Sequence, residues 1–335
     1  MPHITIKDLA TQLKLSPSTV SRALRNHPDI SGGTKKRVLA LAARANYQPN
    51  RIAQSLQTRR SNTIGVIVPE IKHDFFASII SGIEEVSYQA GHTIMVCQSN
   101  DTYDREVVNT RALAANRVAG MLVSTSQETT NYSHLETVMA QGIPLVLFDR
   151  VVEGLAVSMV VVDDFDGAYN AVTYLIRRGY RRIAHLSGSD ALYVSRKRRE
   201  GYEKALRDHG LAVDPALIVK GGYHEKDGHR GAQRLFASAA PPDAIFTIND
   251  PVAIGAYLYI RDAGLRIPDD VALVGFTNNP ISAIIDPPMT TVNQPAFDMG
   301  KAAAGLLLAC FETGVEKHIP RTEVLKTKLI VRKSA

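Results

Sequence analysis

From residue 61 onward, short apolar runs rich in β-branched residues alternate with segments whose apolar positions repeat at helical spacing. Runs that are apolar throughout are typical of strands in parallel sheets, which helices cover on both faces. Strands that alternate with helices over this length of chain predict two α/β lobes. The ten predicted strands are 63–68, 93–97, 118–123, 143–148, 158–162, 182–187, 216–220, 244–248, 271–276 and 328–331.

The first 48 residues have a different pattern, which predicts three short amphipathic helices. Thr5 is the expected N-cap of the first helix. Ser16 would cap the second, and Pro17 suits its first position. The third begins at Ser31 or Thr34. The residues expected to face inward are Ile6, Leu9, Ala10 and Leu13, then Val20, Ala23 and Leu24, then Val38, Leu41, Ala42 and Ala45.

Only Lys14 and Leu15 separate the first two helices, and so tight a connection fits a helix-turn-helix. Lys14 is expected at the turn position, where glycine or asparagine would be easier. A left-handed backbone there costs up to ~1–2 kcal/mol.

The outward face of the second helix carries Ser18 and Arg22, four residues apart, with Thr19 and Ser21 beside them. Arg22 can present two parallel donors to a guanine in the major groove, and the hydroxyl groups can reach phosphates or bases. This pattern is typical of a DNA-recognition helix. An ordinary three-helix bundle with a polar surface is the alternative.

Charge is distributed unevenly along the chain. Residues 1–60 carry eleven Lys and Arg and two Asp and Glu, whereas the other 275 residues carry 28 and 31. A basic head on a slightly acidic body indicates a polyanionic partner, either nucleic acid or a membrane surface, although a solvated charged face would look the same.

Two further features of composition indicate the compartment. No apolar stretch approaches the ~20 residues of a membrane span, and no apolar signal-peptide core opens the chain. We therefore expect a cytoplasmic protein. Cys97 and Cys310 lie far apart in apolar runs, which predicts buried thiols and neither a disulfide nor a metal site.

Longer segments resemble a known family. TIKDLATQLKLSPSTVSRALRNHPDIS and TKKRVLALAARANYQPNRIAQSL are similar to the DNA-binding head of the lactose-repressor (LacI/GalR) family of bacterial transcription regulators. The family's effector-binding core is resembled by TIGVIVPEI, RVAGMLVS, PLVLFDR, VVVDDFDGAYNAVTYLIRRGYRRIAHLSG, AIFTINDPVAIGAYLYIRDAGLRIPDDVALVGF and PPMTTVNQP.

This resemblance implies an N-terminal all-α helix-turn-helix head and a two-lobed α/β core of the periplasmic-binding-protein type, with parallel sheets flanked by helices. The implied head is 1–49, and the hinge helix and linker are 50–60. The N-terminal lobe would be 61–161 with 291–322, and the C-terminal lobe 162–290 with 323–335.

The hinge helix is expected at 51–57, capped by Asn50. A helix this short is marginal alone, and the resemblance implies that it orders only when two subunits occupy operator DNA. Leu56 would then wedge into the minor groove and kink the duplex, unless it contacts its own chain. The expected DNA contacts are Thr5, Ser16, Pro17, Ser18, Thr19, Ser21, Arg22, Asn26, Thr34, Tyr47, Asn50, Arg51, Ala53 and Leu56.

The core sequence indicates binding and not catalysis. It has no Walker A, GxGxxG, HExxH or GxSxG motif, so we expect no enzymatic activity and no cofactor. HEKDGH at 224–229 has two histidines without the spacing to hold one metal, and we interpret it as a polar loop.

Ligands of open α/β sheets lie at the carboxyl ends of strands. Polar or aromatic residues follow several predicted strands there: Phe75, Phe76, Ser124, Gln127, Asp149, Arg150, Asn249 and Asp250.

The family resemblance adds Arg198 before EGY, Tyr223 in the GGY loop and Thr277 after VGF. Arg198 would clamp a hydroxyl pair or a carboxylate. Asn249 would donate and accept hydrogen bonds, and Phe76 or Tyr223 would stack on a ring. Structural roles remain open, because Asp149 and Asp250 could cap helices and the phenylalanines could be core.

Position 277 departs from the family. Where members often carry an aspartate that binds sugar hydroxyls or a purine nitrogen, this chain has Thr277, Asn278 and Asn279. The loss of an ionised acceptor argues against a simple neutral hexose and favours an acidic ligand, such as a sugar acid or phosphosugar.

Three classes of protein fit a two-lobed core. A solute-binding protein would need an export signal and no basic head, and a doubly wound enzyme would need a catalytic constellation. We therefore expect a homodimeric regulator that binds pseudo-palindromic operator DNA under the control of a small effector. Nothing after LIVRKSA resembles a heptad extension, so a dimer is expected and not a tail-assembled tetramer.

Overall fold

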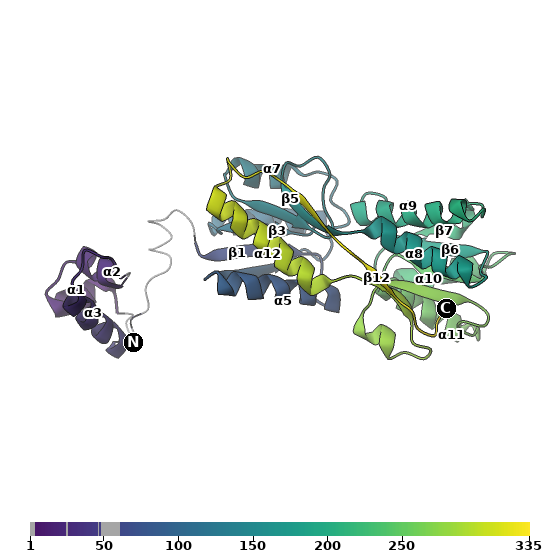
Figure 1. Ribbon diagram of the computed structural model, residues 1–335, viewed down its shortest axis with the longest axis horizontal. Coiled ribbons are helices and arrows are strands. Elements are labelled where there is room, and N and C mark those ends of the chain that lie inside the picture. Colours follow the sequence, from purple (N-terminus) through teal and green to yellow (C-terminus); the bar gives the residue numbers. More distant parts are fainter. Residues whose placement is uncertain (1–3, 25, 46, 48–60) are drawn as a thin grey trace. The chain divides into compact units, whose positions relative to one another are not determined.

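The computed structural model describes residues 4–24, 26–45, 47 and 61–335, which belong to two compact units. The described residues up to 47 form the head, in purple in Figure 1, and residues 62–335 form the core, from blue to yellow. No helix in these described ranges is both long enough and apolar enough to span a bilayer.

The head contains three helices, as predicted: α1 (Ile6–Leu13), α2 (Pro17–Leu24) and α3 (Gly32–Arg44). Thr5 caps α1 in a reciprocal capping box with Asp8. Ser16 Oγ accepts a hydrogen bond from the Thr19 amide at 3.1 Å, and Ser31 Oγ accepts one from the Thr34 amide. The third helix therefore takes Ser31 as its N-cap.

The apolar stripes of the three helices meet in one small core. Leu9, Val20 and Val38 have no exposed surface, while Leu41 and Ala45 are only half-buried against them. Lys14 adopts the left-handed conformation (φ 55°) predicted for the turn residue. These two features make α1 and α2 a helix-turn-helix.

The core contains two six-stranded sheets. The first has the order β11-β5-β4-β3-β1-β2 and is parallel throughout; the second has the order β12-β10-β9-β8-β6-β7 and is parallel except for β12. The strands are β1 (Thr63–Val68), β2 (Thr93–Gln98), β3 (Gly120–Val123), β4 (Leu145–Phe148), β5 (Ser158–Val162), β6 (Ile183–Ser187), β7 (Ile218–Lys220), β8 (Ala244–Thr247), β9 (Ala272–Thr277), β10 (Thr290–Asn293), β11 (Thr322–Leu325) and β12 (Lys328–Ile330).

Helices cover both faces of each sheet. Helices α5 and α12 pack together on one face of the first sheet, with α6 and α7 on the other (Figure 1). In the second sheet, α8 pairs with α9 and α10 pairs with α11. Their bounds are α5 (Asp74–Gln89), α6 (Tyr103–Ala115), α7 (Ser133–Ala140), α8 (Asp164–Arg177), α9 (Tyr193–Asp208), α10 (Glu225–Phe236), α11 (Asp250–Asp262) and α12 (Ala296–Thr313), with 3₁₀ turns η1 (Pro215–Leu217) and η2 (Pro280–Ala283).

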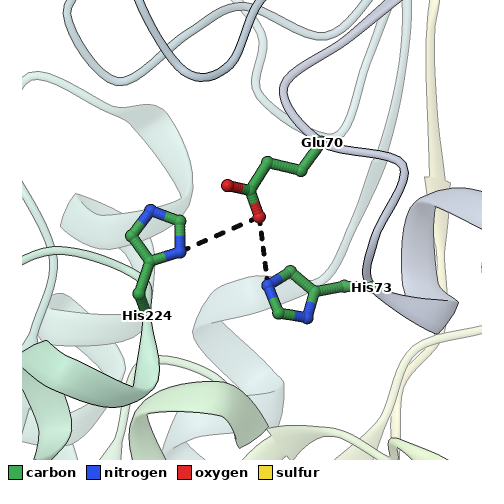
Figure 2. A group of neighbouring side chains, drawn as sticks. All are labelled: Glu70, His73 and His224. Carbon is green, nitrogen blue, oxygen red and sulfur yellow. Dashed lines mark ion pairs between the residues drawn. The ribbon is translucent and has the colours of Figure 1, made fainter.

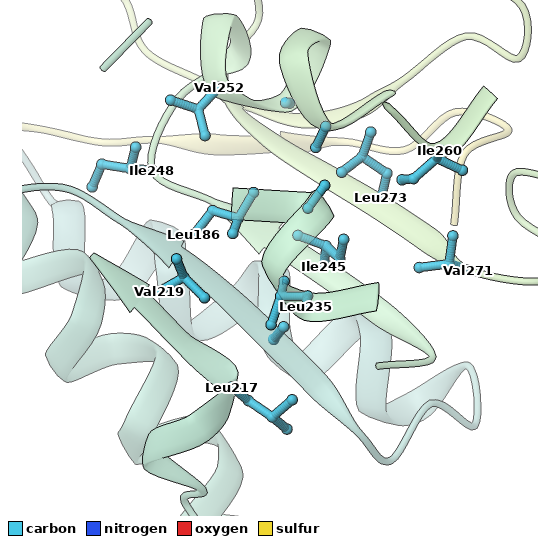
Figure 3. Packing of buried hydrophobic residues seen from close by; sticks show 14 of the residues in the cluster. Leu186, Leu217, Val219, Leu235, Ile245, Ile248, Val252, Ile260, Val271 and Leu273 are labelled. Atoms are coloured by element: carbon cyan, nitrogen blue, oxygen red, sulfur yellow. The ribbon is translucent and has the colours of Figure 1, made fainter. Parts of the chain in front are cut away.

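Alternate residues of each strand supply the two cores of a lobe. In β4, Val146 and Phe148 face α5 and α12, while Leu145 and Leu147 face α6 and α7. Figure 3 shows the equivalent packing in the second lobe, where Ile245 and Leu273 lie under α10 and α11. Burial on both faces explains why these strands are apolar throughout.

All ten predicted strands are present, and β10 and β11 were not predicted. β10 reads TTVN and β11 reads TEVL, so neither is an apolar run, and β11 is a half-exposed edge strand. The chain crosses between the sheets after β5, β10 and β11. The lobe boundaries expected at 291 and 323 instead cut through β10 and β11, so they are a few residues too early.

Glycines permit the close approach of α5 and α12. A Cβ built at Gly300 would lie 2.1 Å from the Ile79 carbonyl oxygen, and one at Gly82 would lie 2.1 Å from the Phe297 carbonyl oxygen. Both contacts are with helix backbone, which cannot rotate away as a side chain can.

We therefore expect Gly300→Ala to lower the free energy of unfolding of the core by about 1–3 kcal/mol or more, because the helices must separate. Gly305→Ala on the same helix meets nothing within 4 Å, so we expect it to raise that free energy by about 0.5–1 kcal/mol. Urea unfolding followed by circular dichroism measures both. Equal effects of the two substitutions would contradict the packing argument.

Candidate functional site

The first turn of α2 gathers three hydroxyl groups. Ser16 Oγ lies 2.8 Å from both Ser18 Oγ and Thr19 Oγ1. Ser16, Pro17 and Ser18 are exposed, whereas Thr19 and Ser21 are half-buried. The exposed Ser16 hydroxyl therefore also caps the helix, by accepting from the Thr19 amide, and a helix N-terminus of this kind suits phosphate.

Arg22 is exposed one turn further along α2. Within the described ranges, no carboxylate or carbonyl group pairs with its guanidinium. An unpaired guanidinium on an exposed helix face is available for bidentate contact with a base or phosphate.

The other predicted DNA contacts are dispersed over the head. Thr5 and Asn26 are exposed, and Asn26 has a positive φ of 55°. The Thr34 hydroxyl lies 2.9 Å from that of Ser31. Tyr47 packs against the head core, and burial raises the pKa of its hydroxyl. The predictions for Asn50, Arg51, Ala53 and Leu56 fall outside the described residues.

In the core, a cleft opens at the carboxyl ends of strands from both sheets. Seven of the predicted effector residues line it: Phe75, Phe76, Asp149, Arg198, Tyr223, Asn249 and Thr277. This is the position that open parallel sheets provide for ligands.

Two predicted residues do not line the cleft. The backbone amide of Gln127 donates to Asp101 Oδ1 at 2.8 Å, so this segment positions Asp101, which does line the cleft. Asp250 is fully buried, and its carboxylate accepts hydrogen bonds from the Asn279 amide, Ser282 and Thr291. Asp250 therefore fixes the loop after β9, which is a structural role. Ser124 is likewise fully buried.

Arg150 connects the lobes through its charge. Its Nη1 donates to Asp101 Oδ1 at 2.5 Å within the first lobe. Its guanidinium carbon lies 4.5 Å from the ring centroid of Tyr223, which comes from the second lobe. A buried guanidinium over an aromatic face gains cation–π attraction, so this contact favours approach of the lobes.

Arg198 is also held by a buried ion pair. Nε donates to Asp164 Oδ1 at 2.8 Å, Nη1 donates to the Ile248 carbonyl at 2.5 Å, and the guanidinium lies 3.8 Å from the Phe276 ring centroid. It is only 3% exposed, although its neighbours in SRKRREGY form a partly exposed charge cluster. Removing Arg198 would leave the Asp164 carboxylate buried and unpaired, typically costing about 3–5 kcal/mol.

Hydrogen bonds fix two further side chains of the cleft, the phenol of Tyr223 and the amide of Asn249. The Tyr223 hydroxyl hydrogen-bonds to Ser195, and burial raises the pKa of Tyr223. Asn249 caps α11, with Oδ1 accepting from the Val252 amide, while Nδ2 donates to the Tyr223 carbonyl. Asn249 therefore positions Tyr223, and both ends of its amide are already engaged.

Asp149 is almost completely buried beside the two arginines. Burial raises the pKa of its carboxyl to about 6, and the nearby charges of Arg150 and Arg198 only partly offset this. Near pH 6 the group therefore changes between hydrogen-bond donor and anion.

Three residues that line this cleft have strained backbone. Asp101, Asp149 and Thr277 have φ values of 61°, 57° and 141°, although none of them is glycine. A β-branched residue such as Thr277 rarely adopts a positive φ, and such strain is typical of ligand-binding positions.

Sequence reasoning missed several cleft residues, and Arg150 was noted only as following a strand. The missed residues are Pro69, Glu70, His73, Asp101, Val194, His224, Pro251, Asn279 and Gln294. Glu70 follows β1 closely and Gln294 follows β10, so strand ends could have indicated both. His224 was interpreted as part of a polar loop, which is wrong, because HEKDGH forms the N-cap and first turns of α10.

Two parts of the chain match models of known protein families. Residues 5–50 match the bacterial regulatory proteins of the lacI family, and residues 172–335 match the periplasmic binding protein-like domain. The chain is 33% identical over 332 residues to the probable HTH-type transcriptional repressor ExuR of Bacillus subtilis (strain 168), covering 96% of this chain and 97% of that protein.

Two solved structures are similar over nearly the whole chain. The lac repressor dimer bound to operator and the anti-inducer ONPF has 25% identity and a TM-score of 0.87, covering 99% of both chains. The complex of the transcriptional regulator CelR with cellobiose has 27% identity and a TM-score of 0.77, covering 99% of this chain and 100% of that one.

A basic helix-turn-helix head joined to a two-lobed α/β core with a polar cleft defines a ligand-binding transcriptional regulator that binds DNA. This chain belongs to the lacI family of bacterial regulatory proteins.

The raised pKa of Asp149 gives a pH-dependent prediction. Folded Asp149 holds its proton up to about pH 6, whereas in the unfolded chain it ionises near its ordinary value of 3.8. The wild type therefore loses stability as pH rises through this window. We expect Asp149→Asn to raise the free energy of unfolding by roughly 1–3 kcal/mol above pH 6.

The gain in free energy of unfolding from Asp149→Asn should shrink as pH falls from 6 to 4. It should vanish below about pH 4, where the wild-type carboxyl is neutral in both the folded and the unfolded state. Urea unfolding of both proteins across pH 4–8 measures the difference. A gain that is independent of pH would show that Asp149 does not titrate in this way.

Proposed function

We propose that this protein represses transcription as a homodimer that binds pseudo-palindromic operator DNA, and that a small anionic effector in the cleft controls its operator affinity. The observation that carries this proposal is the presence, in one chain, of an exposed Arg22 on a helix-turn-helix and of buried Arg150 and Arg198 in a cleft.

The head supports specific DNA binding by its charge and its exposed side chains. It has the basic excess that phosphate contacts need. Arg22 and Ser18 share the outward face of α2, and Arg22 can read a guanine edge in the major groove. In a dimer two such helices would read two half-sites, which gives the operator its pseudo-palindromic form. Because the proposed partner is operator DNA, we also propose that the protein acts in the cytoplasm.

The cleft supports an anionic effector by its donors. Among the described residues, Arg198 donates Nε to Asp164 and Nη1 to the Ile248 carbonyl, so Nη2 remains to contact a carboxylate or phosphate. Protonated Asp149 would add a donor. Thr277 and Asn279 line the cleft with neutral groups. We therefore favour a sugar acid or a phosphosugar. A neutral oligosaccharide is the second candidate, because the similar regulator CelR was solved with cellobiose.

Control of operator affinity would follow from linkage. An effector that binds one arrangement of the two lobes better than another shifts their equilibrium. If the two arrangements of the lobes place the two heads of a dimer differently, a shift in this equilibrium changes operator affinity. Couplings of this kind are typically about 1–3 kcal/mol, or 5–150-fold.

Selection from a random duplex library, using the full chain, tests the DNA-binding proposal and supplies an operator. We expect enrichment of a pseudo-palindrome. We then expect Arg22→Ala to reduce binding to that operator by ~1–3 kcal/mol more than binding to unrelated DNA, because a base contact is lost.

Lys36→Ala is the matched control, since it removes the same charge from an exposed position on α3. It should leave the ratio of specific to non-specific affinity unchanged. Equal losses for Arg22→Ala on both DNAs would make Arg22 a phosphate contact, and a library without any enriched sequence would contradict the proposal.

A further inference from the structure

Three metal-ligating side chains converge at the cleft. Glu70 follows β1, His73 is the N-cap of α5, and His224 is the N-cap of α10 (Figure 2). Their ligand atoms all lie within 4.8 Å of one another. Glu70 and His73 belong to the first lobe and His224 to the second, so the cluster spans the two lobes.

The spacing of these atoms suits a transition metal. Glu70 Oε2 lies 3.0 Å from His73 Nε2 and 3.8 Å from His224 Nδ1. Zn²⁺ binds imidazole nitrogen and carboxylate oxygen at about 2.0–2.2 Å, so tetrahedral geometry separates two ligand atoms by roughly 3.3 Å. The two observed distances bracket this value, and small rotations of the side chains would equalise them.

The direction of the His73 ring also favours a shared ion. Nε2 of His73 is shielded from solvent and has no hydrogen bond of good geometry, although Oε2 of Glu70 lies within ion-pair distance. Its bonding direction therefore does not point straight at that oxygen. A shielded ring nitrogen without a well-aligned partner among the described residues is a group that a cation can bind.

The backbone around the ligands is held in place. The Ile71 amide donates to Gln98 Oε1 at 3.0 Å, which fixes the loop between Glu70 and His73. The His224 amide donates to Asp227 Oδ2 at 3.2 Å. Side-chain exposures of 17–24% leave the three ligands open to an entering ion.

We propose that Glu70, His73 and His224 bind one divalent transition-metal ion of the Zn²⁺ class and thereby connect the two lobes. Two histidines and one carboxylate are a known zinc ligand set that leaves a fourth position open. These three residues also line the cleft, so a water molecule or an oxygen of a cleft ligand would complete the coordination. An ion held by both lobes stabilises the arrangement in which they are close.

The alternative for these residues is an ion pair without metal. Glu70 faces His73, His224 and Lys72, and the His73 side chain, 3.0 Å away, is the main cause of the lowered pKa of Glu70. An ion pair without metal would not bind Zn²⁺ at this position. Measuring Zn²⁺ binding therefore distinguishes the ion pair from the metal site.

Isothermal titration of the tag-free full chain with ZnCl₂ tests the proposal. We expect one Zn²⁺ per chain, and Glu70→Gln, His73→Gln and His224→Gln should each weaken binding at least tenfold. His229→Gln is the matched control, because His229 lies on α10 in edge contact with Tyr259 and outside the cluster. It should bind Zn²⁺ like the wild type. Thermal unfolding with and without Zn²⁺ should show stabilisation of the wild type and the control alone.

Visible spectra of the Co²⁺-loaded wild type provide a measurement that needs no variant, and we expect the absorption of a tetrahedral site with nitrogen ligands. Absence of stoichiometric Zn²⁺ binding by the wild type would overturn the proposal. So would unchanged affinity in the three cluster variants, which would place the ion elsewhere. None of these measurements uses operator DNA, so they stand apart from the test of the proposed function.

Discussion

Two arginines buried in the cleft between the lobes are the constraint on which the core depends. A buried guanidinium must be paired, because an isolated charge in the interior costs far more than a hydrogen bond returns. The chain satisfies Arg150 with Asp101 and Tyr223, and Arg198 with Asp164 and the Ile248 carbonyl. These partners come from different strand ends and helix starts, so the pairing of charge fixes how the loops around the cleft are arranged.

This arrangement of buried charges makes the cleft sensitive to an entering ligand. The third carboxylate, Asp149, has no ion pair of its own among the described residues, and its carboxyl keeps its proton to about pH 6 because burial raises its pKa. Strained backbone at Asp101, Asp149 and Thr277 holds these groups at the surface of the cleft. Three chain crossings connect the lobes. Glu70 and His73 from the first lobe also lie close to His224 from the second. A ligand that enters must therefore rearrange charges that belong to both lobes, which is how a small molecule can shift their equilibrium.

Most strands, the helix caps of the head and part of the cleft were predictable from the sequence. The parallel strands are buried on both faces and so appear as apolar runs, whereas β10 and β11 are short and partly polar and were missed. The cap residues Thr5 and Ser16 have local hydrogen-bonding roles that spacing reveals. Arg198 was predicted in the cleft from the family resemblance alone, because its charged neighbours in SRKRREGY do not show that its own side chain is buried. His73 and His224 are distant in the chain and meet only through the topology, so no local pattern could join them.

The central claim is that occupancy of the cleft changes operator affinity. The most direct measurement is fluorescence anisotropy of labelled operator with the full chain, alone and with glucuronate, glucose 6-phosphate or cellobiose. We predict that an anionic ligand changes operator affinity by about 5–150-fold and that operator changes the affinity for that ligand by the same factor. A ligand that binds the protein tightly while operator affinity stays the same would contradict it.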